Sequence, residues 1–158
     1  MSMRSIPTFA CGLIVSFLVA SCADDAIYWE LPPDMTDEER AAFGEGLELC
    51  NHIATMQQFI AGPGEGNRRV ELRRPENMIT SEFAAGEYAS DLGLMTLVRG
   101  QSHGRLVMVA AHEAMHALAV RHHSGRGIMN AGLNPGSEPP VSFTDDDRAA
   151  CRRAEACP

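Results

Sequence analysis

Between residues 37 and 60, apolar side chains recur every three or four positions, which is the spacing of one helix face. The residues with this spacing are Phe43, Leu47, Cys50 and Ala54. Thr36 precedes the segment and Glu39 follows at the third helical position, so the two match the pattern of a capping box. The sequence therefore predicts one long N-terminal helix from about residue 37 to residue 60.

Apolar runs in the middle of the chain predict strands and a buried helix. Residues 70–72 favour a short strand, and the continuous apolar run at 92–98 is typical of a buried strand. From residue 105 to about residue 119 the chain is apolar almost all round. A helix of that kind belongs in the centre of a fold, covered on every side.

The last third of the chain combines a loop with a second capping pattern. Residues 124–142 are rich in glycine, asparagine and proline, which predicts a loop. Thr144 with Asp147 then predicts a final helix through about residue 154. A chain of 158 residues, 45% apolar and 22% charged, has the size and composition of one globular domain.

The first 22 residues have the layout of an export signal. Arg4 supplies a positive charge, and residues 9–20 are almost wholly apolar but too few for a comfortable membrane span. The ending Val19-Ala20-Ser21-Cys22 resembles the lipobox of bacterial lipoproteins, in which the cysteine is acylated. We therefore expect a lipoprotein signal peptide over 1–22 and lipidation at Cys22.

This signal defines the expected location and organisation of the mature protein. Acylated Cys22 would anchor an exported protein to a membrane without spanning it, in the periplasm, at the outer membrane or at the cell surface. Ordinary cleavage near Ser21 would give a secreted protein instead. Residues 23–35, with two prolines, are predicted to form a tether, and residues 36–158 the folded domain.

The charge of the chain limits its partners. The formal net charge is −8, and an acidic protein repels phosphate backbones, so we expect no nucleic-acid binding. The predicted contact with a membrane is through the lipid anchor only. We expect a monomer.

Removal of the signal peptide leaves Cys50, Cys151 and Cys157. An oxidising compartment permits one disulfide, and the preferred pair joins Cys50 to Cys151. The alternatives are Cys50 with Cys157, Cys151 with Cys157, or three reduced thiols. No CxxC pair occurs, so a cysteine-based zinc site is not expected.

The predicted buried helix carries the sequence His112-Glu113-Ala114-Met115-His116. Histidines four residues apart share one face of a helix, so both imidazoles can reach one metal ion. Glu113 lies beside the first ligand, where it could take a proton from a metal-activated water and pass it to a leaving amine.

A third ligand requires a turn. A continuous helix would place His122 on the wrong side, and His123 roughly 10 Å further along the axis. The chain must therefore reverse after Leu118 to return an imidazole to the metal. By composition the HExxH pattern alone arises about once in fifty shuffled chains, whereas a further histidine six residues on makes chance occurrence rare.

These motifs resemble those of the metzincin zinc metallopeptidases, and among them the matrixins. The long metzincin motif is HExxHxxGxxH followed by a methionine turn. This chain has HEAMHALAVRH at 112–122 and then Met129 within SGRGIMN. Val109-Ala110-Ala111 before the motif and SFTDDDRAAC at 142–151 are also similar to matrixin sequences.

The resemblance implies an α+β, zincin-like fold: a small twisted mixed sheet with a long N-terminal helix, a central active-site helix and a C-terminal helix. It implies one catalytic Zn²⁺ ion, Glu113 as the general base, and Met129 as an apolar floor beneath the metal. The implied metal ligands are His112, His116 and His122. The implied substrate is a peptide or protein, held extended against an edge strand.

One departure from the family pattern concerns the third ligand. Ala119 replaces the usual glycine, and alanine at positive φ costs on the order of 1 kcal/mol. A shifted turn would use the adjacent His123 in place of His122. His52 and His103 lie outside the motif and are expected at the surface.

The sequence therefore predicts a zinc-dependent endopeptidase that hydrolyses peptide bonds. The main alternative is an exported zinc-binding lipoprotein without peptidase activity. A structural or interaction lipoprotein with incidental histidines is the third possibility, although three buried imidazoles would each need a hydrogen-bond partner.

Overall fold

The computed structural model describes residues 26–54, 57–62, 68–74, 77, 85–130 and 142–157. The predicted signal peptide and Cys22 lie outside the described residues, as do residues 131–141 of the predicted loop. No helix in the described ranges has both the length and the apolar character needed to cross a membrane.

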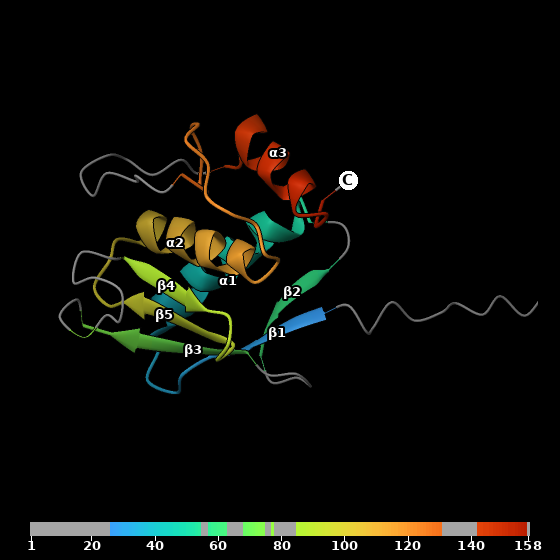
Figure 1. The fold of residues 1–158 in the computed structure, drawn as a ribbon. Coiled ribbons are helices and arrows are strands. Elements are labelled where there is room, and N and C mark those ends of the chain that lie inside the picture. Colours follow the sequence, from blue (N-terminus) through green and yellow to red (C-terminus); the bar gives the residue numbers. More distant parts are fainter. Residues whose placement is uncertain are drawn as a thin grey trace, which may run out of the picture.

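Five described strands form one mixed sheet in the order β2-β1-β3-β5-β4 (Figure 1). The strands are β1 Ala26–Glu30, β2 Gln58–Ala61, β3 Arg68–Arg73, β4 Gly86–Ala89 and β5 Leu94–Val98. Only β4 runs antiparallel to its neighbour; the other neighbouring strands are parallel. As the last strand of the order, β4 forms one edge of the sheet.

The described helices are α1 Asp37–Asn51, α2 His103–His116 and α3 Asp145–Arg153. Figure 1 shows α1 and α2 over one face of the sheet, with α3 beyond them on the side away from the strands. The described chain is therefore an α+β structure with a five-stranded mixed sheet and three helices.

Part of the predicted tether over 23–35 belongs to the fold, so that prediction was wrong for Ala26–Glu30, which is β1. Its side chains alternate, with Ile27 and Trp29 buried. Trp29 is fully buried and meets Phe43 of α1 edge to face, with ring centroids 6.4 Å apart. Burying an indole removes a large apolar area from water, which fixes this short segment in the sheet.

The predicted N-terminal helix starts where expected and ends earlier. The Thr36 side chain accepts the Glu39 amide and the Glu39 carboxylate accepts the Thr36 amide, which confirms the capping box. The helix ends at Asn51, not near residue 60. The Asn51 side chain donates to the Phe59 carbonyl at 3.0 Å and accepts the Phe59 amide at 2.7 Å, so it ties β2 back against the helix end.

The remaining predicted elements are confirmed with shifted ends. Strand β3 covers the predicted strand at 70–72, and β5 lies within the predicted run at 92–98, with all five residues buried. Residues 106–115 of α2 are all buried, as expected for a central helix. A Cβ added at Gly46 of α1 would lie 2.7 Å from the Val107 carbonyl oxygen, so α1 and α2 pack backbone to backbone there.

The predicted disulfide between Cys50 and Cys151 was wrong. Cys151 is bonded to Cys157, with Cα atoms 5.3 Å apart. The chain turns back after α3 through Glu155, which adopts a φ of 56°, and this turn brings Cys157 to Cys151. Cys50 is a buried thiol on the α1 face that packs on α2, where it donates to the Ala111 carbonyl at 3.4 Å.

Candidate metal centre

The chain reverses between the second and third histidines of the motif. After α2 ends at His116, Ala119 adopts a φ of 59°, and the Val120 amide bonds to the Met115 carbonyl at 3.2 Å. This reversal returns His122 to the helix face that carries His112. The turn expected after Leu118 is therefore present, with alanine in the left-handed conformation.

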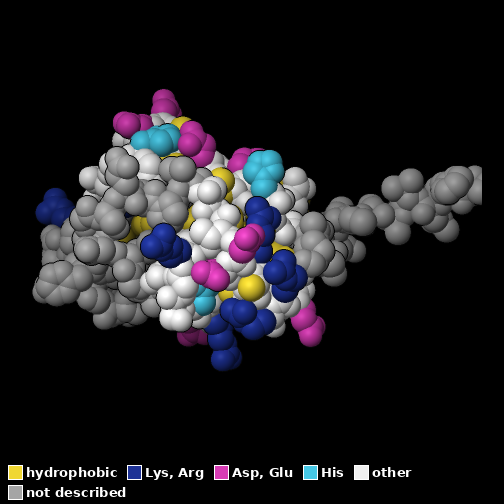
Figure 2. Space-filling model, turned by 90° about the horizontal axis from the view of Figure 1, so that it is seen from above, with side chains coloured by type: hydrophobic (Ala, Val, Ile, Leu, Met, Phe, Trp, Pro, Cys, Tyr) yellow, Lys and Arg dark blue, Asp and Glu magenta, His cyan; other side chains and the backbone are white. Residues whose placement is uncertain are grey.

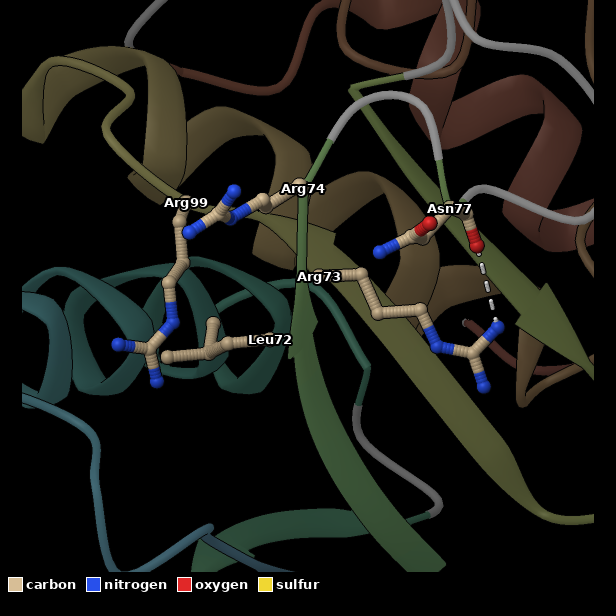
Figure 3. A pocket seen from close by; sticks show the side chains of 5 residues that line it. All are labelled: Leu72, Arg73, Arg74, Asn77 and Arg99. Atoms are coloured by element: carbon tan, nitrogen blue, oxygen red, sulfur yellow. Dashed lines mark hydrogen bonds between the residues drawn. The ribbon is translucent and has the colours of Figure 1, made fainter.

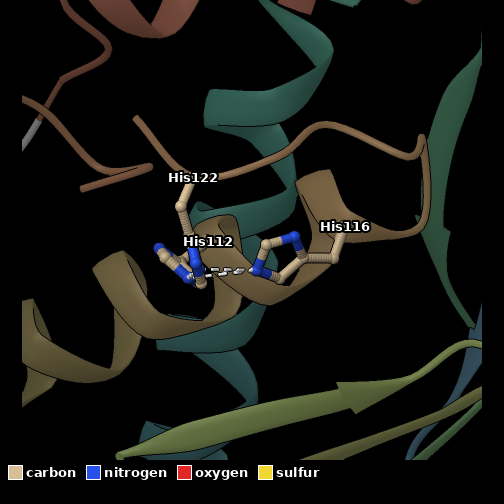
Figure 4. A group of neighbouring side chains, drawn as sticks. All are labelled: His112, His116 and His122. Atoms are coloured by element: carbon tan, nitrogen blue, oxygen red, sulfur yellow. Dashed lines mark hydrogen bonds between the residues drawn. The ribbon is translucent and has the colours of Figure 1, made fainter. Parts of the chain in front are cut away.

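The three histidines converge through their Nε2 atoms (Figure 4). The Nε2 of His112 lies 2.9 Å from that of His122 and 3.2 Å from that of His116, and the last pair is 3.0 Å apart. Three nitrogen ligands at about 2.0–2.1 Å from a tetrahedral ion would lie roughly 3.3 Å from one another. The observed separations are close to that value, so the three residues could hold a metal ion.

The outer ring nitrogens determine which tautomers are present. The Nδ1 of His112 donates to the Ile128 carbonyl at 2.6 Å, and the Nδ1 of His116 donates to the Val120 carbonyl at 2.8 Å. A neutral imidazole carries one proton, so both Nε2 atoms keep a bare lone pair. Lone pairs facing one another repel, and a shared cation between them removes the repulsion.

The electrostatics of the cluster favour neutral rings. Burial, with a smaller effect of the neighbouring imidazoles, lowers the pKa of His112 to about 4, although its hydrogen bond to the Ile128 carbonyl and the nearby Asp147 act in the opposite direction. Burial likewise lowers the pKa of His116 and of His122 below the ordinary value. Neutral imidazole is the form that binds a metal, so near neutral pH the ligand set needs no proton loss.

His123 does not join the cluster. Its Nδ1 accepts the Gly125 amide at 3.1 Å, so its Nε2 carries the proton and donates to Asp147 at 2.9 Å. Both ring nitrogens are therefore engaged elsewhere. This geometry selects His122 over His123 as the third nitrogen of the cluster.

Asp147 joins α3 to the segment that contains Met129. Its carboxylate accepts the Met129 amide at 2.7 Å and the Ile128 amide at 3.1 Å, besides the His123 ring. Burial alone would raise the pKa of Asp147, but the hydrogen bonds from Thr144, Met129 and His123 outweigh it and leave the pKa lowered. The sequence marked this residue only as a helix cap.

Glycine and methionine complete this turn. Gly127 has a φ of 139°, and a Cβ there would overlap the Asp147 carboxylate, so only glycine lets the carboxylate reach the backbone amides. Met129, predicted to lie in a methionine turn, is fully buried. The carbonyl of Met129 accepts the His123 amide at 3.1 Å, which holds this turn beside His122.

Glu113 lies on α2 next to the first histidine and is only 6% exposed. Burial, together with the nearby Glu87 of β4, raises its pKa to about 8. A Cβ added at Gly86 of β4 would overlap Val109 and lie 3.3 Å from the Glu113 carboxylate. The bare backbone at Gly86 therefore gives the carboxylate its space, a feature that the sequence alone did not reveal.

The two histidines outside the motif lie apart from this cluster. His52 is exposed at the end of α1. His103 is partly exposed at the start of α2 and contacts Glu45 through its Nε2 at 3.1 Å. Both are accordingly near the surface, as the sequence predicts.

A pocket of about 450 Å³ lies near the end of the sheet where α2 begins (Figure 3). It is lined by Leu72, Arg73, Arg74, Asn77 and Arg99. Arg73 pairs with Glu71 at 2.7 Å, and Arg99 pairs with Asp34. The lining includes no histidine, cysteine or carboxylate, so we place the candidate site at the histidines in the last part of α2.

The described part of the face seen in Figure 2 carries arginine and acidic side chains interspersed, with small separate hydrophobic areas.

No protein-family model matches the sequence, and the comparison with curated proteins found no similar sequence. Function must therefore be inferred from the chemistry of the histidine cluster and of Glu113.

Proposed function

We propose that this protein is a zinc-dependent endopeptidase, similar to the matrixins among the metzincins. The observation that carries the proposal is the convergence of three imidazole Nε2 atoms on a helix that also carries a buried glutamate. His112, His116 and His122 would hold the ion. Three nitrogen ligands from the protein are typical of catalytic zinc sites, whereas structural zinc sites usually have four protein ligands.

A zinc ion held there would polarise the scissile carbonyl and lower the pKa of an attacking water. Glu113 follows the first of these histidines on α2 and is the proposed general base. It accepts a proton from the attacking water and then donates it to the departing nitrogen. Burial and the nearby Glu87 raise the pKa of this group, whereas a zinc ion held at the histidines would favour the carboxylate form that the first step needs.

The position of β4 supports an extended peptide as the substrate. This strand ends the sheet order, so one of its edges pairs with no other described strand. Gly86 of β4 lies against the Glu113 side chain. A peptide added as a further strand along this edge would pass close to the proposed base, and main-chain hydrogen bonds would align it.

We further propose that the protein is exported and, through Cys22, anchored by lipid. The support is the charged, apolar and small-residue sequence of the first 22 residues. Globomycin treatment of producing cells and mass spectrometry of the mature N-terminus test this part. An unmodified Cys22, or a retained signal, would contradict it.

Zinc content and cleavage of a peptide library test the enzymatic proposal. Wild type and Glu113→Gln should each retain about one zinc per chain after dialysis, and only wild type should cut. His116→Ala should lose both properties, and His52→Asn, which removes an exposed imidazole, should keep both. Zinc retention without cleavage by wild type would favour a metal-binding lipoprotein, and loss of zinc by wild type would exclude a metal centre.

A further inference from the structure

A network of hydrogen bonds connects the first and third histidines of the cluster through one carboxylate. His112 donates to the carbonyl of Ile128 at 2.6 Å. The amides of Ile128 and Met129 donate to Asp147 at 3.1 and 2.7 Å. The position of the His112 ring therefore depends on where Asp147 holds this turn.

The third histidine is connected to the same carboxylate by its neighbour in the sequence. His123 donates from Nε2 to Asp147 at 2.9 Å and accepts the Gly125 amide at Nδ1. Its own amide bonds to the Met129 carbonyl at 3.1 Å. The ring is nearly buried, with 9% of its side chain exposed, and has hydrogen bonds on both sides.

We propose that His123 and Asp147 form a positioning pair, which holds His112 and His122 at the separation that a divalent metal ion requires. The inference rests on the proposed metal centre, and it assigns to His123 a role other than ligation. His116 needs no such support, because its own bond to the Val120 carbonyl lies within the turn. Partners of this kind orient ligands before the metal binds, which lowers the ordering cost of binding.

Two substitutions separate the bond to Asp147 from the bond to Gly125. In His123→Gln, the amide nitrogen reaches about as far as Nε2 and can still donate to Asp147. In His123→Asn, the shorter amide reaches only the position of Nδ1, so it can keep the Gly125 contact and not the Asp147 contact. Asp147 and its other donors are unchanged in both variants.

Zinc affinity should be measured by competition with a chromophoric chelator, and ligand geometry by the absorption spectrum of the Co²⁺ form. His123→Asn should bind zinc about 10- to 100-fold more weakly and change the Co²⁺ spectrum. His123→Gln should stay within about threefold of wild type with an unchanged spectrum. His52→Asn is the control for loss of an imidazole. Unfolding of each metal-free variant in urea shows whether affinity loss merely follows lost stability.

Each outcome decides one question. Wild-type zinc affinity and Co²⁺ spectrum in His123→Asn would overturn the positioning role and leave the proposed function standing. Equal weakening in both His123 variants would also overturn it, because the Asp147 bond would then not matter. If His123→Asn does not fold, a loss above about tenfold in His123→Gln would overturn the role. Failure of wild type itself to bind zinc would overturn both proposals.

Discussion

Helices α1 and α3 both begin with a capping box. In each, the side chain of a threonine accepts the amide of the third helical residue, and the carboxylate of that residue accepts the threonine amide. In α1 the returning side chain is Glu39, which lies near the surface and makes no other bond in the described structure. In α3 it is Asp147, which is fully buried and also bonds His123, Ile128 and Met129.

The two helices therefore dock by different means. α1 presents an apolar face to α2 and the sheet, and its buried residues are Ala42, Phe43, Gly46, Leu47 and Cys50. α3 buries only Asp147, Ala150 and Cys151, so a carboxylate takes the place of a broad apolar face. The disulfide links the helix to the residues that directly follow it. The capping box of α1 is therefore a local feature, whereas that of α3 also joins the helix to distant residues.

We expect the largest effect from asparagine at position 147, which would weaken the attachment of α3 and leave that of α1 unchanged. Asp147→Asn places an NH₂ group among donors that now share a carboxylate, so at least two buried donors lose an acceptor. We expect the free energy of unfolding in urea to fall by about 3–5 kcal/mol. The matched change Glu39→Gln keeps an acceptor in an exposed capping box and should cost less than about 0.5 kcal/mol. Equal losses at the two positions would show that Asp147 acts only as a cap.

Adding a methyl group at Gly46 tests the close packing of α1 against α2. In Gly46→Ala, the new Cβ would lie 2.7 Å from the Val107 carbonyl oxygen and 2.8 Å from the Ala110 Cβ. Overpacking of this kind should lower the free energy of unfolding by about 1–3 kcal/mol. Gly44→Ala, on the same helix, meets nothing within 4 Å and should raise it by up to about 1 kcal/mol through helix propensity. A free energy of unfolding of Gly46→Ala equal to that of wild type would contradict the backbone-to-backbone packing of α1 and α2.

The contribution of the Asp147 charge to stability should depend on pH, with a smaller effect than the substitutions above. The pKa of Asp147 is lowered on folding, so its charge stabilises the folded state above the ordinary carboxyl pKa, about 4. That contribution is lost as pH falls through the lower folded value. The difference in unfolding free energy between wild type and Asp147→Asn should stay constant from pH 7 to pH 5 and narrow below about pH 4. A difference that widens in acid would contradict the lowered pKa.

The sequence predicted both helix starts correctly because capping is local. The bonds of Thr36 with Glu39 and of Thr144 with Asp147 join residues three apart, so the chain specifies them wherever it folds. Convergence of the three histidines was also predictable, since a helix sets the spacing of His112 and His116, and a metal site shared with His122 would require a reversal.

Contacts between distant parts of the chain were not predictable in the same way. Five residues of β1 are too few to show a reliable period, and the strand is recognised only by its pairing with β2 and β3 and by the burial of Trp29. Phe59 continued the helical spacing, yet Asn51 closes the helix and pairs with it across a turn. The cysteine pairing depended on a return of the chain after α3, which spacing alone does not specify.

Ala119 makes the chain reversal with a φ of 59°, a conformation that strains a residue with a Cβ by about 1 kcal/mol. In the denatured ensemble, however, alanine samples fewer backbone states than glycine, which spares about 0.4–1 kcal/mol of entropy on folding. The saved entropy therefore offsets part of the strain and not all of it. A sharp reversal between His116 and His122 can thus be encoded without glycine at a net cost smaller than the strain itself.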